Sequence, residues 1–147
     1  MIQMDPTSPI KNQTQIKRAM AYVQLNYKDT KLGIHQIAHE LNLSADYFRQ
    51  LFKQVSGMNF PFYLNQIRII KAQEKLKQPD LRISEIAYSI GYESLEYFGK
   101  VFKKFTGMTP THFRRLTRLQ PILNTQSTPP SNSHNQDQEA TQSPLAP

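Results

Sequence analysis

The chain of 147 residues contains no cysteine. This absence excludes disulfides, thiolate metal sites and cysteine nucleophiles, and it fits a reducing compartment. No run of 18 apolar residues occurs, and the first residues, MIQMDPTSPIKNQTQ, hold no apolar stretch of the length that a signal peptide needs. We therefore expect a soluble protein with a cytoplasmic location and no membrane partner.

Groups typical of catalysis are also missing. We find no nucleophile–base set, no phosphate-binding loop and no carboxylate pair, so we expect neither enzymatic activity nor a cofactor. His35 and His39 stand four residues apart beside Glu40, a spacing that can hold zinc. The order is not HExxH, and no cysteine or evident third ligand accompanies the pair, so no metal site is predicted.

The charge of the chain is unevenly distributed. All 18 Lys and Arg but only eight of the 11 Asp and Glu lie between Lys11 and Arg118, which gives this interval a net charge of +10. A basic folded region between nearly neutral ends favours a polyanionic partner. A solvated cationic surface without a nucleic-acid partner is the alternative, because charge alone carries no specificity.

Composition changes towards both ends. From Gln120 onward the sequence is rich in Pro, Ser, Thr, Gln and Asn and has no aromatic residue, so it cannot bury enough apolar surface to offset the entropy of ordering. All 15 aromatic residues fall between Tyr22 and Phe113. We therefore predict three segments: a flexible N-terminus (1–11), a folded unit (12–118) and a disordered polar tail (119–147).

Within the folded unit the apolar spacing is helical throughout, with no alternating strand pattern. Seven helices are predicted, the fourth starting at Asn59-Phe60-Pro61 and stopping at Pro79, and the last opening at Thr109-Pro110. The apolar positions that mark the first six are Ile16, Met20, Val23 and Tyr27; Ile34, Ile37, Ala38 and Leu41; Phe48, Leu51, Phe52 and Val55; Leu64, Ile67, Ile70 (or Lys71) and Leu76; Ile83, Ile86, Ala87 and Ile90; and Phe98, Val101, Phe102 and Phe105.

One segment of this unit is present twice. SEIAYSIGYESLEYFGKVFKKFTGMTP (84–110) repeats HQIAHELNLSADYFRQLFKQVSGMN (35–59), with an offset of 49 residues at first and of 50 from Ser44 and Ser94 onward. The extra residue, Glu93, falls between two predicted helices, where an insertion disturbs least.

The gap between those helices predicts a specific turn. Asn42 and Gly91 stand at matching positions directly after the first helix of each pair, and both residue types tolerate a left-handed backbone. Ser44 and Ser94 follow where an N-cap is needed. A helix, a short left-handed turn and a capped helix make a helix-turn-helix, so we predict an all-α fold with two such subdomains joined by a long helix. A helical protein–protein interaction module with incidental basic charge remains the alternative.

The second copy, ISEIAYSIGYESLEYFGKVFKKFTGMTPTHFRR, resembles the signature region of AraC/XylS-type transcription regulators. The first copy and the joining helix, with Arg68, Ala72 and Leu76 in RIIKAQEKL, are similar to the preceding half of that DNA-binding domain. The resemblance covers about residues 14–118. Gly33 departs from it, since the family often has a capping Ser there, but Gly is an acceptable cap. It implies a homeodomain-like double helix-turn-helix that binds double-stranded DNA.

In each motif the second helix (about 44–55 and 94–105) turns one face to the core and the other outward. A recognition helix places its N-terminal half over base edges, and Arg49 and Gln50 have the geometry to read guanine and adenine. The resemblance implies base contacts at the same helix positions, and residues further along, like the capping serines, are better placed for phosphates. The base-contact candidates are Ala45, Asp46, Arg49, Gln50, Leu95, Glu96, Gly99 and Lys100, and the phosphate-contact candidates are Ser44, Lys53, Ser94, Lys103 and Lys104.

The outward faces differ between the copies, which predicts two different half-sites. The joining helix, from about Asn59 to Lys77, spans roughly 28 Å, comparable with the roughly 34 Å between successive major grooves on one DNA face. We therefore expect a monomer to read an asymmetric site. Activation is the role we expect, with RNA polymerase as a candidate partner, although these residues do not distinguish activation from repression, nor a standalone regulator from a fragment that lacks an effector domain.

Overall fold

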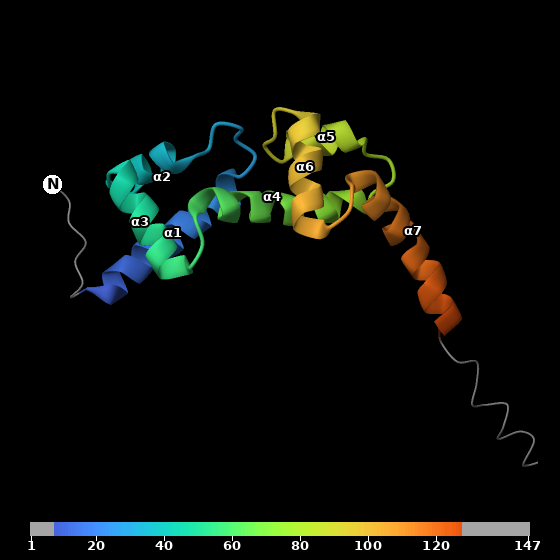
Figure 1. Cartoon of the computed structure of the whole chain (residues 1–147), viewed down its shortest axis with the longest axis horizontal. Helices are drawn as coiled ribbons and strands as arrows, with labels where there is room; N and C mark the ends of the chain where they lie inside the picture. Colours follow the sequence, from blue (N-terminus) through green and yellow to red (C-terminus); the bar gives the residue numbers. More distant parts are fainter. Residues whose placement is uncertain (1–7, 128–147) are drawn as a thin grey trace, which may run out of the picture. The chain divides into compact units, whose positions relative to one another are not determined.

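The computed structural model describes residues 8–127, with side chains described as far as Gln120 (Figure 1). These residues form seven helices and no strand, which confirms the predicted all-α fold. The helices are α1 (Pro9–Asn26), α2 (Ile34–Glu40), α3 (Ala45–Ser56), α4 (Phe60–Leu76), α5 (Ile83–Ser89), α6 (Leu95–Thr106) and α7 (Pro110–Ser127).

Helical structure extends past the predicted folded unit of 12–118 at both ends. α1 already begins at Pro9, since a proline in the first helical position gives up no hydrogen bond, and α7 continues to Ser127. The polar composition that predicted disorder does not prevent this, because Gln and Leu are good helix formers. The remainder of the predicted flexible N-terminus and disordered tail, 1–7 and 128–147, lies outside the described residues.

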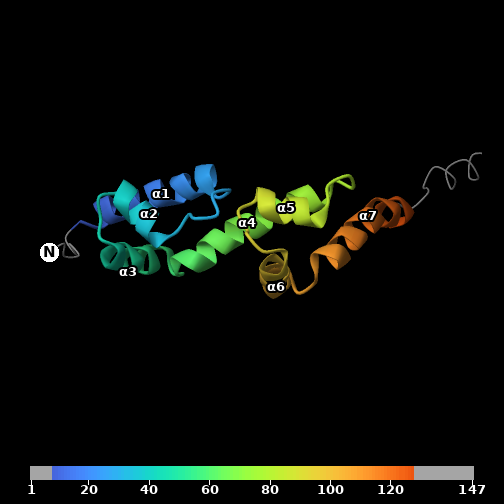
Figure 2. The same ribbon diagram turned by 90° about the horizontal axis from the view of Figure 1, so that it is seen from above.

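The chain divides into two compact units, the first ending at Arg114 and the second beginning at Arg115. Two hydrophobic clusters lie in the first unit. One joins α1, α2 and α3 to α4 as far as Ile67, and the other joins α4 from Ile69 onward to α5 and α6. Figures 1 and 2 both show α4 running between these two groups of helices, so each helix-turn-helix packs on its own part of α4.

Two of the predicted core positions are wrong. In α4 it is Ile69 that is buried, at 3% exposure, whereas Ile70 is 44% exposed, because this helix packs against two cores and buries residues on more than one face. In α3, Val55 is 36% exposed. The contact of this part of α3 with α4 is made by Phe52, whose ring centroid lies 5.5 Å from those of Phe60 and Tyr63.

The predicted turn chemistry is confirmed in both motifs. Asn42 and Gly91 adopt positive φ angles of 57° and 105°. The hydroxyl oxygens of Ser44 and Ser94 accept hydrogen bonds from the backbone amides of Tyr47 and Tyr97, at 3.2 and 3.1 Å. The two helix-turn-helix motifs are therefore built by the same local rules.

Candidate nucleic-acid interface

The predicted reading residues of α3 lie on its solvent face. Asp46, Arg49, Gln50 and Lys53 are exposed, and Ala45 is half-buried at the start of the helix. Phe48, Leu51 and Phe52 are fully buried on the opposite face and fix the rotation of the helix. The amphipathic pattern of α3 thus leaves one continuous polar strip available to a partner.

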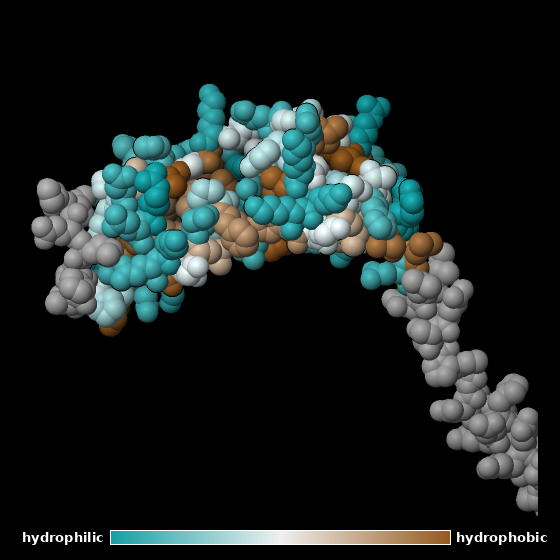
Figure 3. Space-filling view, viewed as in Figure 1, coloured by the Kyte–Doolittle hydropathy of each residue, from teal (hydrophilic) through white to brown (hydrophobic). Residues whose placement is uncertain are grey.

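The same division holds for α6. Phe98, Val101 and Phe102 are buried, and the outward face carries the predicted residues of the second motif. On this face Leu95 is 42% exposed and Gly99 is half-buried. The remaining predicted residues are all exposed: Glu96, Lys100, Lys103 and Lys104. Figure 3 shows hydrophilic side chains over α3 and α6 on one face, with apolar ones between them along α4.

In both helices an acid in the first turn pairs with the cation that is predicted to read a base. Arg49 Nη1 lies 2.8 Å from Asp46 Oδ1, and Lys100 Nζ lies 3.5 Å from Glu96 Oε1. The acids also complement the positive end of the helix dipole. Because every one of these side chains is more than half exposed, each pair contributes at most about 0.5 kcal/mol, so a cation can leave its acid for a base edge at small cost.

The capping serines have a structural role in addition to their predicted one. Each hydroxyl oxygen accepts from an amide of the first turn, while its O–H remains able to donate to a phosphate oxygen. Both serines are exposed at the N-terminus of a 12-residue helix, where the free amides and the dipole favour an anion.

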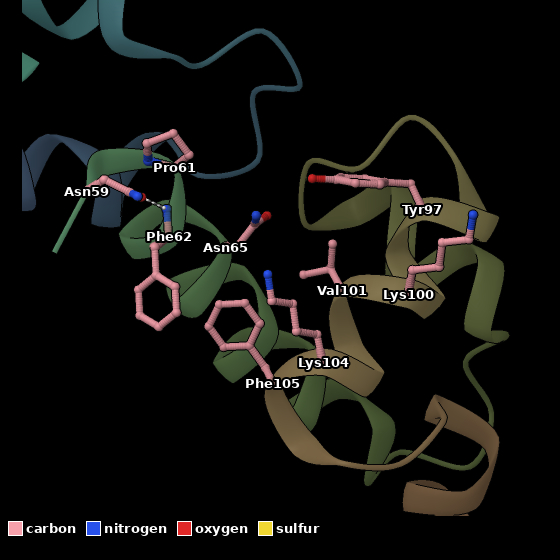
Figure 4. A pocket seen from close by; sticks show the side chains of 9 residues that line it. All are labelled: Asn59, Pro61, Phe62, Asn65, Tyr97, Lys100, Val101, Lys104 and Phe105. Carbon is pink, nitrogen blue, oxygen red and sulfur yellow. Dashed lines mark hydrogen bonds between the residues drawn. The ribbon is translucent and has the colours of Figure 1, made fainter.

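A surface groove of about 360 Å³ lies between the start of α4 and the outward face of α6 (Figure 4). Phe62 and Phe105 stack on one side of it with ring centroids 4.9 Å apart. In Figure 4, Lys104 reaches across the groove towards Asn65, whereas Lys100 points away from it. The two lysines of one helix face therefore present their charges in different directions.

Two exposed aromatic residues of this groove were missed from the sequence. Phe62 is 43% exposed and Tyr97 is 53% exposed. Tyr97 matches Tyr47 of the first copy, and a residue that both copies share is expected to belong to the scaffold. Phe62 falls outside the apolar spacing of its helix, and an aromatic residue off that spacing was the available signal.

Within 8–127 no three His, Cys, Asp or Glu side chains gather as metal ligands would, and His35 and His39 form no such group. None of the helices described is both long and apolar enough to span a bilayer.

Comparison with known proteins agrees with this geometry. A family model described as a helix-turn-helix domain matches residues 37–116. The regulatory protein PocR of Salmonella typhimurium is 32% identical over 123 residues, which cover 84% of this chain and 38% of PocR. The transcriptional activator RhaR of Escherichia coli is 32% identical over 112 residues, which cover 76% of this chain and 39% of RhaR. The chain therefore spans about two fifths of the length of these curated relatives.

Solved structures extend the likeness to three dimensions. The C-terminal domain of AraT, a response regulator from Geobacillus stearothermophilus, superposes with a TM-score of 0.67 at 36% identity, over 69% of this chain and 84% of that domain. An AraC-type regulator from Chromobacterium violaceum (TM-score 0.67, 24% identity, 76% of this chain and 98% of that one) shares the fold. So does the DNA-binding domain of AdpA in complex with a target DNA (0.68, 20%, 72% and 96%). The chain thus belongs to the AraC family of helix-turn-helix transcription regulators, which are DNA-binding proteins and not enzymes.

Proposed function

We propose that the chain binds an asymmetric DNA site as a monomer, with α3 and α6 in successive major grooves. The observation that carries this proposal is the contrast between two matching scaffolds and two different outward faces. The caps, turns and buried rings match, whereas Arg49 and Gln50 of α3 stand where α6 has Gly99 and Lys100. Two readers that differ at these positions select two different half-sites.

Within this proposal each side chain has a role. Arg49 reads guanine through its two-pronged guanidinium, Gln50 reads adenine, and Lys100 reaches guanine acceptors. Leu95 contacts a thymine methyl, and Glu96 accepts from a cytosine amino group. The remaining candidates of both helices, including Ala45 and Asp46, line the same strips. Phosphate contacts then fix the register, and they come from Ser44, Lys53, Ser94, Lys103 and Lys104.

The regulatory direction that we propose is activation. It is the role named for RhaR, which this chain matches over a part of its length. RNA polymerase is the partner that an activator requires, and a cytoplasmic location follows from both partners.

Random-site selection followed by footprinting tests the proposal. We expect an enriched, non-palindromic sequence whose protected region spans two successive major grooves. Arg49→Ala should weaken binding by about 5- to 150-fold and relax the preference at one base position. Lys53→Ala is the matched control on the same helix, because loss of a phosphate contact weakens all sequences alike and lowers the salt slope by about one. A selection that enriches no sequence contradicts the proposal.

A further inference from the structure

Arg68 is the one charged side chain that is buried among the described residues, at 6% exposure. From the middle of α4 its Nε donates to the Tyr27 carbonyl oxygen at 2.9 Å, and its Nη2 donates to the Asp29 carbonyl oxygen at 2.8 Å. Tyr27 is the C-cap of α1, so the guanidinium binds the end of the first helix. Burial lowers the pKa of Arg68, but arginine stays charged at neutral pH.

The same guanidinium also contacts the second subdomain. It lies 5.4 Å from the centroid of the Tyr92 ring, within the range of a cation–π interaction. Tyr92 belongs to the turn between α5 and α6, and its hydroxyl donates to Asn65 Oδ1 of α4 at 2.7 Å. Arg68 therefore joins the end of α1, the middle of α4 and the turn of the second motif.

Gly91 makes this close approach possible. A Cβ at this position would overlap the Tyr27 carbonyl oxygen and would lie 2.7 Å from Arg68 Nε. The matching residue of the first motif, Asn42, is exposed and tolerates a side chain. The turn of the second motif is thus packed directly against the chain that leaves α1.

We propose that Arg68 is a positioning residue that holds α3 and α6 in a fixed relation and so sets the spacing between half-sites that the protein accepts. This inference rests on the proposed function, in which both helices read one DNA molecule. Adding one base pair between half-sites moves the second by about 3.4 Å and rotates it by about 35°. We call the contacts of Arg68 with Tyr27, Asp29 and Tyr92 the joint. If the joint holds α3 and α6 rigidly, the two helices cannot both bind the displaced half-sites, whereas a loosened joint lets them do so.

The first experiment measures spacing preference on DNA. The duplexes are the selected site, the same site with one base pair inserted between half-sites, and a site with one half scrambled. For the native chain we expect the insertion to weaken binding at least about tenfold, close to the single half-site level. For Arg68→Met we expect the insertion to cost less than about threefold, with single half-site binding unchanged. Native spacing preference in Arg68→Met would overturn the inference.

The second experiment needs no DNA. Because the chain has no cysteine, Gln54→Cys and Glu93→Cys place two spin labels at exposed positions, one on α3 and one in the turn before α6. Double electron–electron resonance should give a narrow distribution of label-to-label distances for the otherwise native chain. We expect Arg68→Met to broaden that distribution. If the native chain shows no spacing preference but the distribution broadens, the proposed function has failed and the joint stands. If Arg68→Met leaves the width of the distance distribution unchanged, Arg68 does not hold the two motifs together and the inference is overturned.

Two glycine variants provide a second test of the inference if Arg68→Met does not fold. Gly91→Ala and Gly107→Ala both place alanine at a positive φ, 105° and 84°, but only the first brings a methyl group against the joint. Gly91→Ala should broaden the distance distribution and weaken the spacing preference. Gly107→Ala should lower stability without either effect. Equal behaviour of the two variants counts against the inference.

Discussion

Replacing Gly99 by alanine should stabilise the protein and weaken its binding to DNA. Gly99 lies inside α6, has no positive φ, and offers open space, since beyond the adjacent backbone of its own helix an added Cβ would meet no atom within 4 Å. Alanine is better than glycine in a helix interior by about 0.8–1 kcal/mol. For a folded unit of about this size, that gain raises the melting temperature by about 4 °C.

The expected loss of binding comes from the surface around Gly99. A groove of about 530 Å³ runs along this face, and Leu95, Gly99 and Lys103, one helical turn apart, form one wall of it. Within the proposed function this groove receives DNA, and the missing side chain lets it come close. A methyl group there should weaken binding to the full site by about five- to tenfold, comparable with the loss of one base contact.

Calorimetry and fluorescence anisotropy separate the two effects. A duplex that keeps only the half-site of α3 is the control, and its affinity for Gly99→Ala should equal that of the native chain. If the melting temperature rises while full-site affinity is unchanged, DNA does not approach Gly99 closely. If the melting temperature falls, the open space around this residue has been misjudged.

Two further variants test a cap and a buried phenol. Ser94→Ala removes the acceptor of the Tyr97 amide and should lower the free energy of unfolding by about 1 kcal/mol in a urea titration, and Ser94→Asp, which keeps an acceptor, should restore most of it. Burial raises the pKa of Tyr92 above its ordinary 10.0, so the unfolded chain loses this proton first and stability falls as pH rises above about 10. Tyr92→Phe should flatten that alkaline decline in denaturation curves, and an unchanged slope would assign the decline to other groups.

The sequence was sufficient for the features that depend on neighbouring residues. These features are the serine caps, the left-handed residue after a short helix and the apolar residues at helical spacing. Each depends on residues only a few positions apart, and each occurs in both copies of the repeat, so one copy supports the prediction made from the other. The outward residues of α3 and α6 followed directly, because a helix that buries Phe48 and Phe52 has only one face left to present.

Contacts between distant parts of the chain could not be read in this way. Arg68 binds carbonyl groups that lie 41 and 39 residues earlier. A buried arginine and a solvated one look alike in sequence, since the acceptors are backbone atoms that every residue carries. The burial of Ile69 in place of the predicted Ile70 has a related cause, because a single helical period describes one buried face, and α4 packs against two cores.

Because α4 packs against both motifs, the similarity between the two halves of the chain includes contacts outside the helix-turn-helix motifs. Arg68 of α4 binds the carbonyl oxygens of Tyr27 and Asp29 at the end of α1, and Arg114 of α7 binds those of Leu76 and Gln78 at the end of α4. The second pair of carbonyls lies 49 residues after the first, which is the initial offset of the repeat, whereas the two arginines lie 46 residues apart.

Each repeated unit therefore runs from one helix, through a helix-turn-helix, to a following helix whose arginine binds the end of the first. α4 closes the first unit and opens the second, so the units overlap and no flexible linker separates them. Since each residue of a helix rises 1.5 Å and turns about 100°, a shared helix sets the separation and the rotation of the two motifs as long as Arg68 holds both of them against it. A protein with two independent DNA-binding motifs joined by a flexible linker would accept many spacings between half-sites. The overlap of the two units on α4 is the physical reason to expect that this protein accepts a single spacing between half-sites.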